Sequence, residues 1–183
     1  MLKSAAEGNL SLMQVTTLAT ERLTLRPLTL EDATFILELL NEPSFIEHIG
    51  DKQVRTLEDA RAYIETGPQA SHSTHGFGLD RVELSSTLQP IGMCGLLKRD
   101  ILPDPDVGYA FLPQFWSRGY ASAAVRAVLN DATQRLALKR VAAVVSNDND
   151  ASIRLLERIG FRFQRMFEFY EGEPEARLYQ IDL

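Results

Sequence analysis

The chain has 183 residues, 45% of them hydrophobic, which is enough to bury the core of one domain. Its formal net charge of -6 and pI near 5.1 argue against a broad nucleic-acid-binding surface, because such a surface needs clustered lysine and arginine. No apolar run approaches the length of a membrane-spanning helix, so we expect a soluble protein without a membrane segment. The single cysteine, Cys94, excludes an internal disulfide and favours the cytoplasm.

The chain divides into a short arm and one domain. Residues 1–20 carry a single lysine and no continuous apolar core, so they make a poor signal peptide, and we expect a loosely ordered arm. Residues 21–183 contain no internal repeat and no low-complexity tract. We therefore expect them to form a single domain.

Strand and helix patterns are mixed in the first half of this domain. Thr29 with Asp32 three residues later is typical of a helix start, and Gly67-Pro68 is typical of a helix end. The polar segment Ser71–Gly76 predicts a loop. The expected strands are Glu21–Pro27, Phe77–Leu84 and Ile91–Lys98, the last two forming a hairpin, and the expected helices begin after Thr29, at Pro43 and at Leu57, ending near Leu40, His48 and Thr66.

The second half predicts a strand-helix-strand unit followed by a helix and a hairpin. Val107–Leu112 and Val141–Val145 have the composition of buried parallel strands, joined by an amphipathic helix that begins near Ala121. A helix is expected at Ala151–Ile159, and a hairpin at Phe161–Phe169 with Ala176–Ile181. The predicted fold is a mixed α/β sheet, mostly antiparallel with one central parallel pair, flanked by about four helices.

The most informative stretch is the glycine-bearing loop that leads directly into the amphipathic helix. It reads Pro113-Gln114-Phe115-Trp116-Ser117-Arg118-Gly119-Tyr120-Ala121. Such a junction directs free backbone N–H groups to one spot, where the helix dipole adds positive potential. The sequence therefore predicts a binding site for a phosphorylated cofactor.

Three ordered motifs in residues 21–182 resemble the GCN5-related N-acetyltransferase (GNAT) superfamily, and within it the RimJ/RimL-type branch. The loop is similar to the family's Q/R-x-x-G-x-G/A pyrophosphate motif, except that Ser117 replaces a glycine. The strand before it, 106–113, is similar to the one that binds the pantetheine arm. The segment from Asn149 to Phe161 matches the branch signature N-x-x-S…E-K-x-G-F, with Arg158 in place of lysine.

The resemblance implies acetyl-CoA as co-substrate, without a metal, bound between two splayed parallel strands, 107–112 and 141–145. Main-chain groups of Phe111 and Leu112 would bond the pantetheine amides, and amides of the loop would hold the pyrophosphate. The implied coenzyme-binding residues are Phe111, Leu112, Gln114, Ser117, Arg118, Gly119, Tyr120, Ala121, Asn149 and Ser152.

The resemblance also suggests the catalytic groups. Leu156 occupies the position where many members carry a general-acid tyrosine, so the role of assisting the thiolate passes to Ser152. Asp106 is the favoured base for the amine, with Glu83 and His75 as alternates, although a solvated loop position for Asp106 fits the sequence equally well. Trp116 is expected in the core, and His72 and His75 are expected in a loop rather than as metal ligands.

The predicted activity is transfer of the acetyl group to a primary amine by direct attack within a ternary complex. The branch suggests a protein N-terminal α-amine, such as that of a ribosomal protein. A polyamine, an amino acid or an aminoglycoside remains an alternative acceptor, and a non-catalytic acyl-CoA sensor is an alternative function. We expect a monomer or a homodimer, with acceptor choice set by segments Pro43–Asp51 and Glu171–Glu175.

Overall fold

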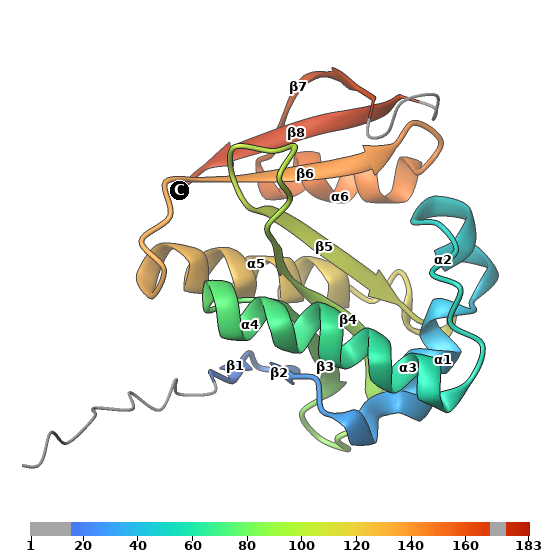
Figure 1. Ribbon diagram of the computed structural model, residues 1–183. Helices are drawn as coiled ribbons and strands as arrows, with labels where there is room; N and C mark the ends of the chain where they lie inside the picture. Colours follow the sequence, from blue (N-terminus) through green and yellow to red (C-terminus); the bar gives the residue numbers. More distant parts are fainter. Residues whose placement is uncertain (1–15, 169–174) are drawn as a thin grey trace, which may run out of the picture.

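The structure is a computed structural model that describes residues 16–168 and 175–183 (Figure 1). Within these residues one mixed sheet runs in the order β1-β2-β3-β4-β5-β6-β8-β7. Its strands are β1 (Leu18–Ala19), β2 (Leu23–Pro27), β3 (Leu79–Leu84), β4 (Pro90–Leu97), β5 (Asp106–Phe111), β6 (Arg140–Ser146), β7 (Arg162–Phe167) and β8 (Ala176–Asp182).

The pair formed by β5 and β6 is parallel, whereas the other strand pairs of the described sheet are antiparallel. Its register contains a single pair, Asp106 with Ala142, and the Ala142 N–H donates to the Pro105 carbonyl at 2.9 Å. Beyond that point the two strands diverge, as Figure 1 shows. The predicted splayed parallel pair in a mostly antiparallel sheet is confirmed.

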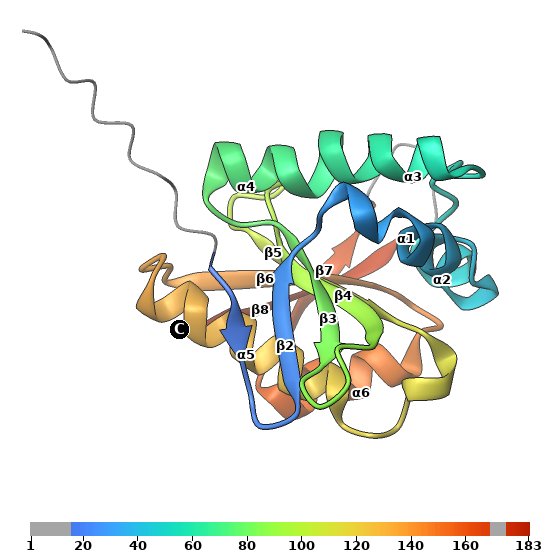
Figure 2. The ribbon, with the colours of Figure 1, turned by 90° about the horizontal axis from the view of Figure 1, so that it is seen from below.

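Helices cover both faces of the sheet. Figure 2 shows α3 and α4 in line on one side, near α1 and α2, with α5 and α6 on the opposite side. Apolar residues of both layers, including Ile36, Ile64 and Val125, are fully buried and join the strand residues in one core. The helices are α1 (Ala33–Leu40), α2 (Pro43–His48), α3 (Leu57–Ile64), α4 (Ala70–His75), α5 (Tyr120–Gln134) and α6 (Asp150–Ile159).

The loop predicted at Ser71–Gly76 is wrong, because this segment forms α4 and ends at Gly76 with φ of +75°. Nor does Gly67-Pro68 end the preceding helix. The chain passes from α3 to α4 through a π turn at Glu65–Gln69 that contains the buried Pro68. In this wider turn the Ala70 N–H donates to the Glu65 carbonyl, five residues back, so helical bonding continues past a residue that lacks an N–H.

The remaining predicted elements are present. The hairpin of β3 and β4, the strand-helix-strand unit of β5, α5 and β6, and the helix α6 all form, and Gly160 ends α6 with φ of +120°. Residues 18–19 of the predicted arm pair with β2. The predicted turn at 171–174 lies outside the described residues. In the described part of the chain, no helix is both long and apolar enough to cross a bilayer.

Candidate active site

A cavity of about 970 Å³ opens where β5 and β6 separate. Its walls come from the end of α2 and the residues after it, from α3 and α4, from β4 to β6, and from the first turns of α6. The sequence-predicted residues Asp106, Asn149 and Ser152 all line it. The splayed strands therefore leave a space that contains both proposed catalytic residues.

Ser152 meets a partner that sequence reasoning missed. The Tyr109 phenol, on β5, lies beside the Ser152 hydroxyl on α6, near enough for that hydroxyl to lower the phenol's pKa. Burial has the larger effect and raises the pKa of Tyr109 to about 12, so the phenol is protonated at neutral pH. Leu156, at the usual tyrosine position, is buried in the same wall and cannot donate a proton.

Asn149 fixes the first turn of α6. Its side-chain oxygen accepts a hydrogen bond from the Ser152 N–H at 3.0 Å, which makes Asn149 the N-cap of the helix. The cap fixes the direction in which the Ser152 side chain projects from the helix. Asn149 therefore acts on the site through Ser152, and its side-chain oxygen is already engaged.

Asp106 begins β5 with only 1% of its surface exposed, so the solvated loop position is wrong. Arg99 approaches both carboxylate oxygens through Nε, at 3.0 and 3.1 Å. Burial raises the pKa of Asp106, whereas the Arg99 charge and hydrogen bond lower it. Three residues along the strand separate Asp106 from Tyr109, a distance of about 10 Å, so Asp106 reaches chemistry near Tyr109 only through water.

The two alternate bases lie in different places. His75 lines the same cavity from α4 and stacks on Phe77, with 5.7 Å between ring centroids. Glu83 does not line it. Instead Glu83 is buried on β3, where Arg81 contacts it at 2.7 Å and Arg26 at 3.6 Å. Glu83 is therefore not positioned to act as the base.

The glycine-bearing loop forms a left-handed turn before α5. Ser117 has φ of +59° and Gly119 has φ of +78°, which explains why a glycine is usual at both positions. No side chain caps α5 in the described structure, so the N–H groups of its first turn are free to bind an anion. Ala121 and the part-buried Tyr120 begin that turn, and Gln114 and Arg118 are exposed beside it.

A second cation lies at this loop that the sequence did not reveal. Arg22 places its guanidinium carbon 4.8 Å from the centre of the Tyr120 ring, and a Cβ built on Gly119 would lie 3.3 Å from an Arg22 nitrogen. Arg22 precedes β2, far from the loop in sequence. Only the packing of β2 beside the start of α5 brings Arg22 and Arg118 to the same end of the helix.

The backbone of β5 alternates between β4 and the gap. The Leu112 N–H donates to the Ile91 carbonyl of β4, so by alternation the main-chain groups of Val107, Tyr109 and Phe111 face the gap. The Phe111 carbonyl accepts the Trp116 indole N–H at 2.7 Å. Trp116 is 48% exposed, so its expected place in the core is wrong. Both main-chain groups of Leu112 are already bonded within the protein.

The histidines of α4 form no metal site. His72 Nε2 lies 2.8 Å from an Asp80 oxygen, and the described residues contain no group of three histidine, cysteine, aspartate or glutamate side chains able to hold a metal ion. Cys94 is fully buried on β4, and burial raises the pKa of its thiol, so it is a poor nucleophile.

Comparison with known proteins agrees with this geometry. Residues 22–162 match the family model described as an acetyltransferase (GNAT) domain. The chain is 29% identical to the uncharacterized N-acetyltransferase YoaA of Bacillus subtilis (strain 168), over 90% of this chain and 95% of that protein. It is also 29% identical to the uncharacterized N-acetyltransferase p20 of Bacillus licheniformis, over 90% and 92%. The chain is therefore an acetyltransferase, and it belongs to the GNAT acetyltransferase family.

Solved structures share the fold. An acetyltransferase from Agrobacterium tumefaciens str. C58 superposes with a TM-score of 0.77 at 28% identity, over 91% of this chain and 94% of that one. RimL, a ribosomal L7/L12 alpha-N-protein acetyltransferase in complex with coenzyme A, gives a TM-score of 0.80 at 16% identity, over 92% and 98%. At this identity the likeness to RimL shows that the two proteins share a fold.

Proposed function

We propose that this acetyltransferase moves the acetyl group of acetyl-CoA onto a primary amine by direct attack, with Ser152 and Tyr109 assisting the leaving thiolate. The observation that carries the proposal is that Tyr109 and Ser152 lie side by side at the point where β5 and β6 have separated. The amine nitrogen bonds to the thioester carbon, the carbon–sulfur bond breaks, and the thiolate takes up one proton. No acetyl-enzyme forms, since Cys94 is buried and inert.

The proton for the thiolate passes along a short relay. Ser152 donates its hydroxyl proton to sulfur and takes up a proton from solvent, while the adjacent Tyr109 phenol orients the Ser152 hydroxyl. A phenol with a pKa of about 12 is a weaker acid than a thiol, so Tyr109 keeps its own proton throughout. Tyr109 thus supplies the phenol that Leu156 lacks, from a strand instead of a helix.

Main-chain N–H groups of β5 that face the gap would stabilise the tetrahedral oxygen, because the diverging β6 leaves them without a strand partner. Gln114, Ser117, Arg118, Gly119, Tyr120 and Ala121 would hold the pyrophosphate, with Arg22 as an added cation. Of the two main-chain candidates for the pantetheine arm, Phe111 faces the gap and Leu112 does not. We therefore assign that contact to Phe111.

The amine proton leaves toward Asp106 through water. Burial raises the pKa of Asp106, which makes the carboxylate a stronger base, although the Arg99 charge and hydrogen bond act to lower that pKa. His75, which lines the same cavity, is the second candidate to accept the amine proton. Replacing Asp106 by Asn would slow transfer most at low pH, where fewer amine molecules are already neutral.

The charges of the cavity favour a monoamine over a polyamine. Lys52, Lys98 and Arg99 line it, against the carboxylates Asp51 and Asp106 among the described residues. A polyamine would bring several cations to this wall. An α-amine at a peptide N-terminus, with carbonyl or acidic groups close behind it, is the acceptor that we propose, followed by a small monoamine.

The experiment compares Tyr109→Phe and Ser152→Ala with Tyr63→Phe. Tyr63 is a matched control, because it lines the same cavity and burial raises its pKa to about 12 as well. Release of free thiol from acetyl-CoA is followed with peptides and small amines as acceptors. We expect Tyr109→Phe and Ser152→Ala each to lower kcat about tenfold or more, and the double variant to lose little beyond that, while Tyr63→Phe keeps its rate.

Equal rates for Tyr109→Phe and Tyr63→Phe would overturn the relay. Thiol release that requires no amine would overturn direct transfer. Coenzyme binding without turnover on any acceptor would instead support the acyl-CoA sensor.

A further inference from the structure

Two buried polar atoms at the active-site cavity have no hydrogen-bond partner within the protein. Among the described residues, the buried side-chain atoms that lack a partner are His48 Nδ1, Arg81 Nε and Ser146 Oγ. His48 and Ser146 line the cavity at the split of β5 and β6, whereas Arg81 does not. A buried polar atom that stays unbonded costs free energy, and a bound molecule that bonds to it would recover that cost.

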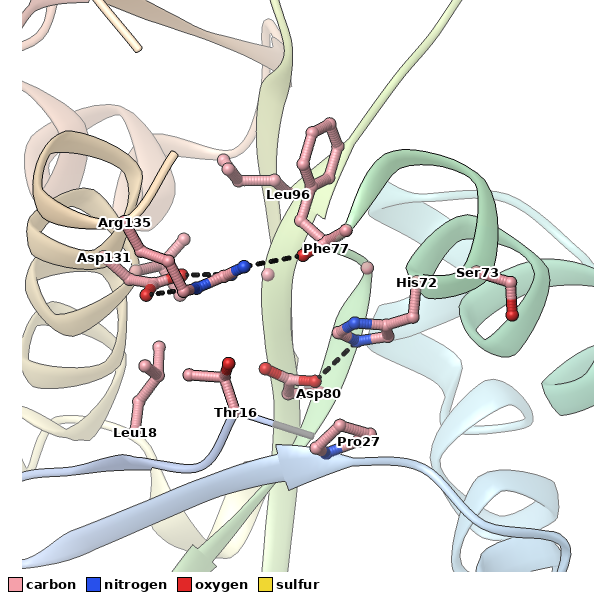
Figure 3. Close-up of a pocket in the computed structure, with 14 residues that line it drawn as sticks. Thr16, Leu18, Pro27, His72, Ser73, Phe77, Asp80, Leu96, Asp131 and Arg135 are labelled. Carbon is pink, nitrogen blue, oxygen red and sulfur yellow. Dashed lines mark hydrogen bonds and ion pairs between the residues drawn. The ribbon is translucent and has the colours of Figure 1, made fainter. Parts of the chain in front are cut away.

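A smaller cavity, of about 430 Å³, provides the contrast (Figure 3). It lies between α4 and α5, and its charged side chains are paired with one another, His72 with Asp80 at 2.8 Å and Arg135 with Asp131 at 2.6 Å. In the part of the chain that the structure describes, no residue lining it contributes a buried side-chain atom without a partner. The missing hydrogen bonds thus point to a ligand in the active-site cavity and not in the smaller one.

Ser146 lies close to the level of the reacting groups, across the gap from β5. The strands β5 and β6 are parallel, and Asp106 is opposite Ala142. Three residues further along, Tyr109 on β5 is level with Val145 on β6, and Ser146 is the next and last residue of β6. The Ser146 hydroxyl is therefore on the β6 side of the gap, beside the place proposed for the reacting amine.

His48 approaches the same end of β6 from α2. It is the last residue of that helix, and its Nδ1 lies 3.9 Å from a carboxylate oxygen of Asp148. This separation is too long for a hydrogen bond, so Asp148 does not satisfy the ring nitrogen. Because Asp148 follows Ser146 by two residues, the contact shows that α2 comes close to the chain where it leaves β6. The two unbonded atoms belong to neighbouring walls of one cavity.

A single amide group in the cavity would satisfy both atoms. The Ser146 hydroxyl can donate to a carbonyl oxygen, and an imidazole nitrogen that carries no proton accepts an N–H. The carbonyl and the N–H of a trans peptide bond point in opposite directions, so their partners have to come from different sides of the peptide. A strand end and a helix end that approach each other meet this requirement. Rotation about single bonds turns the hydroxyl and the ring toward the cavity.

We propose that Ser146 and His48 recognise the first peptide bond of the acceptor, with Ser146 donating to its carbonyl and His48 Nδ1 accepting from its N–H. The inference rests on the proposed transfer to an N-terminal α-amine, and it names the residues that select a peptide over other primary amines. An alkylamine offers neither group. An ester keeps the carbonyl and has an oxygen in place of the N–H, so acceptors that differ by one group separate the two contacts.

The experiment measures acetyl transfer to L-alanine N-methylamide, L-alanine methyl ester and isopropylamine. Each variant is compared with the wild type on the same acceptor, so that differences in the pKa of the amines cancel. Ser146→Ala is expected to raise KM about fivefold or more for the amide and the ester, and to leave it unchanged for isopropylamine. His48→Phe is expected to raise KM by a similar factor for the amide alone. We expect kcat to change little, because both contacts are already made in the bound substrate.

Ser71→Ala is the matched control. The Ser71 hydroxyl lines the same cavity but already donates to the Phe77 carbonyl at 2.8 Å. Its loss is expected to change the three KM values by the same factor. Ser146→Thr, which keeps a hydroxyl, should retain most of the preference for the amide.

Failure of this inference is distinguishable from failure of the proposed function. Acetylation of isopropylamine alone would leave the proposed transfer standing and overturn the peptide contacts. If the wild type acetylated no acceptor, the transfer itself would fail, and calorimetry with the product N-acetyl-L-alanine N-methylamide and coenzyme A, which needs no turnover, would decide the contacts. Equal KM changes on all three acceptors, a product that the wild type does not bind, or product affinity unaffected by both Ser146→Ala and His48→Phe would each overturn the inference.

Discussion

Ser117 holds the loop before α5 in a strained backbone conformation. Its φ of +59° lies in the left-handed region, which a residue with a Cβ rarely adopts. The left-handed turn aims the loop at the first turn of α5. We infer that the loop geometry is imposed by its surroundings, and that the serine tolerates it.

Replacing Ser117 by Gly is therefore expected to raise the free energy of unfolding by about 1 kcal/mol, because glycine adopts this conformation without a steric penalty. The measurement is urea denaturation at equilibrium. Coenzyme affinity should be kept, since the backbone N–H remains.

Gly119→Ala is the matched opposite case. With φ of +78° and an Arg22 nitrogen 3.3 Å from the new Cβ, this variant should lose stability and coenzyme affinity together. If Ser117→Gly destabilised the protein and Gly119→Ala did not, the strain would be assigned to the wrong residue.

At the scale of elements, Asp32 joins α1 to the sheet. Its carboxylate accepts from the Thr29 N–H at 2.9 Å and from Arg26 and Arg81 at 2.9 and 2.6 Å. Burial alone would raise the pKa of Asp32, but these bonds outweigh it and lower the pKa to about 2. One side chain thus caps a helix start and neutralises two strand arginines.

Asp32→Asn is expected to cost about 3 kcal/mol of unfolding free energy, since it leaves two part-buried arginines short of a counter-charge. Asp59→Asn, at the equivalent capping position in the first turn of α3, is the control and should cost less, because Asp59 is only partly buried and its carboxylate accepts from backbone N–H groups and not from an arginine side chain. Urea denaturation compares the two variants. A larger loss from Asp59→Asn would contradict the role given to the arginines.

The pH dependence has a definite sign. The folded-state pKa of Asp32, about 2, is below its usual value of 3.8, so its stabilisation is complete above about pH 4 and is lost as the pH falls through 2. The difference amounts to about 2 kcal/mol. Stability measured from pH 5 down to pH 2 should fall less steeply for Asp32→Asn than for the wild type.

The sequence predicts elements well where a local pattern decides them, as with α5, α6 and the hairpin of β3 and β4. It fails at α4, because Gly67-Pro68 signals a stop unless the helix widens into a π turn, and only packing against the sheet favours that turn. At the site it predicts Ser152 from a motif. Nothing in the sequence distinguishes Tyr109 from other strand residues. Arg22 lies beside the loop before α5 only because of the order of the strands in the sheet.

At the scale of the whole molecule, the sheet consists of two parts, β1 to β5 and β6 to β8, that share one register pair in the described structure, Asp106 with Ala142. Within each of these two parts, the strand pairing is continuous. Where β5 and β6 have separated, the two parts are linked through α5 and through the contact of α5 with α6. The opening that we propose admits the coenzyme is therefore also a weak point of the sheet.

Coenzyme A is expected to stabilise the fold by filling this opening. At a hundredfold excess over Kd, linkage gives about 2.7 kcal/mol, which calorimetry would register as a rise in Tm that grows with the logarithm of ligand concentration. Hydrogen exchange should show the added protection at Tyr109 and Phe111 on β5, and in β6. Stabilisation with protection confined to the first turn of α5 would mean that the nucleotide binds the loop while the thiol arm stays outside the split.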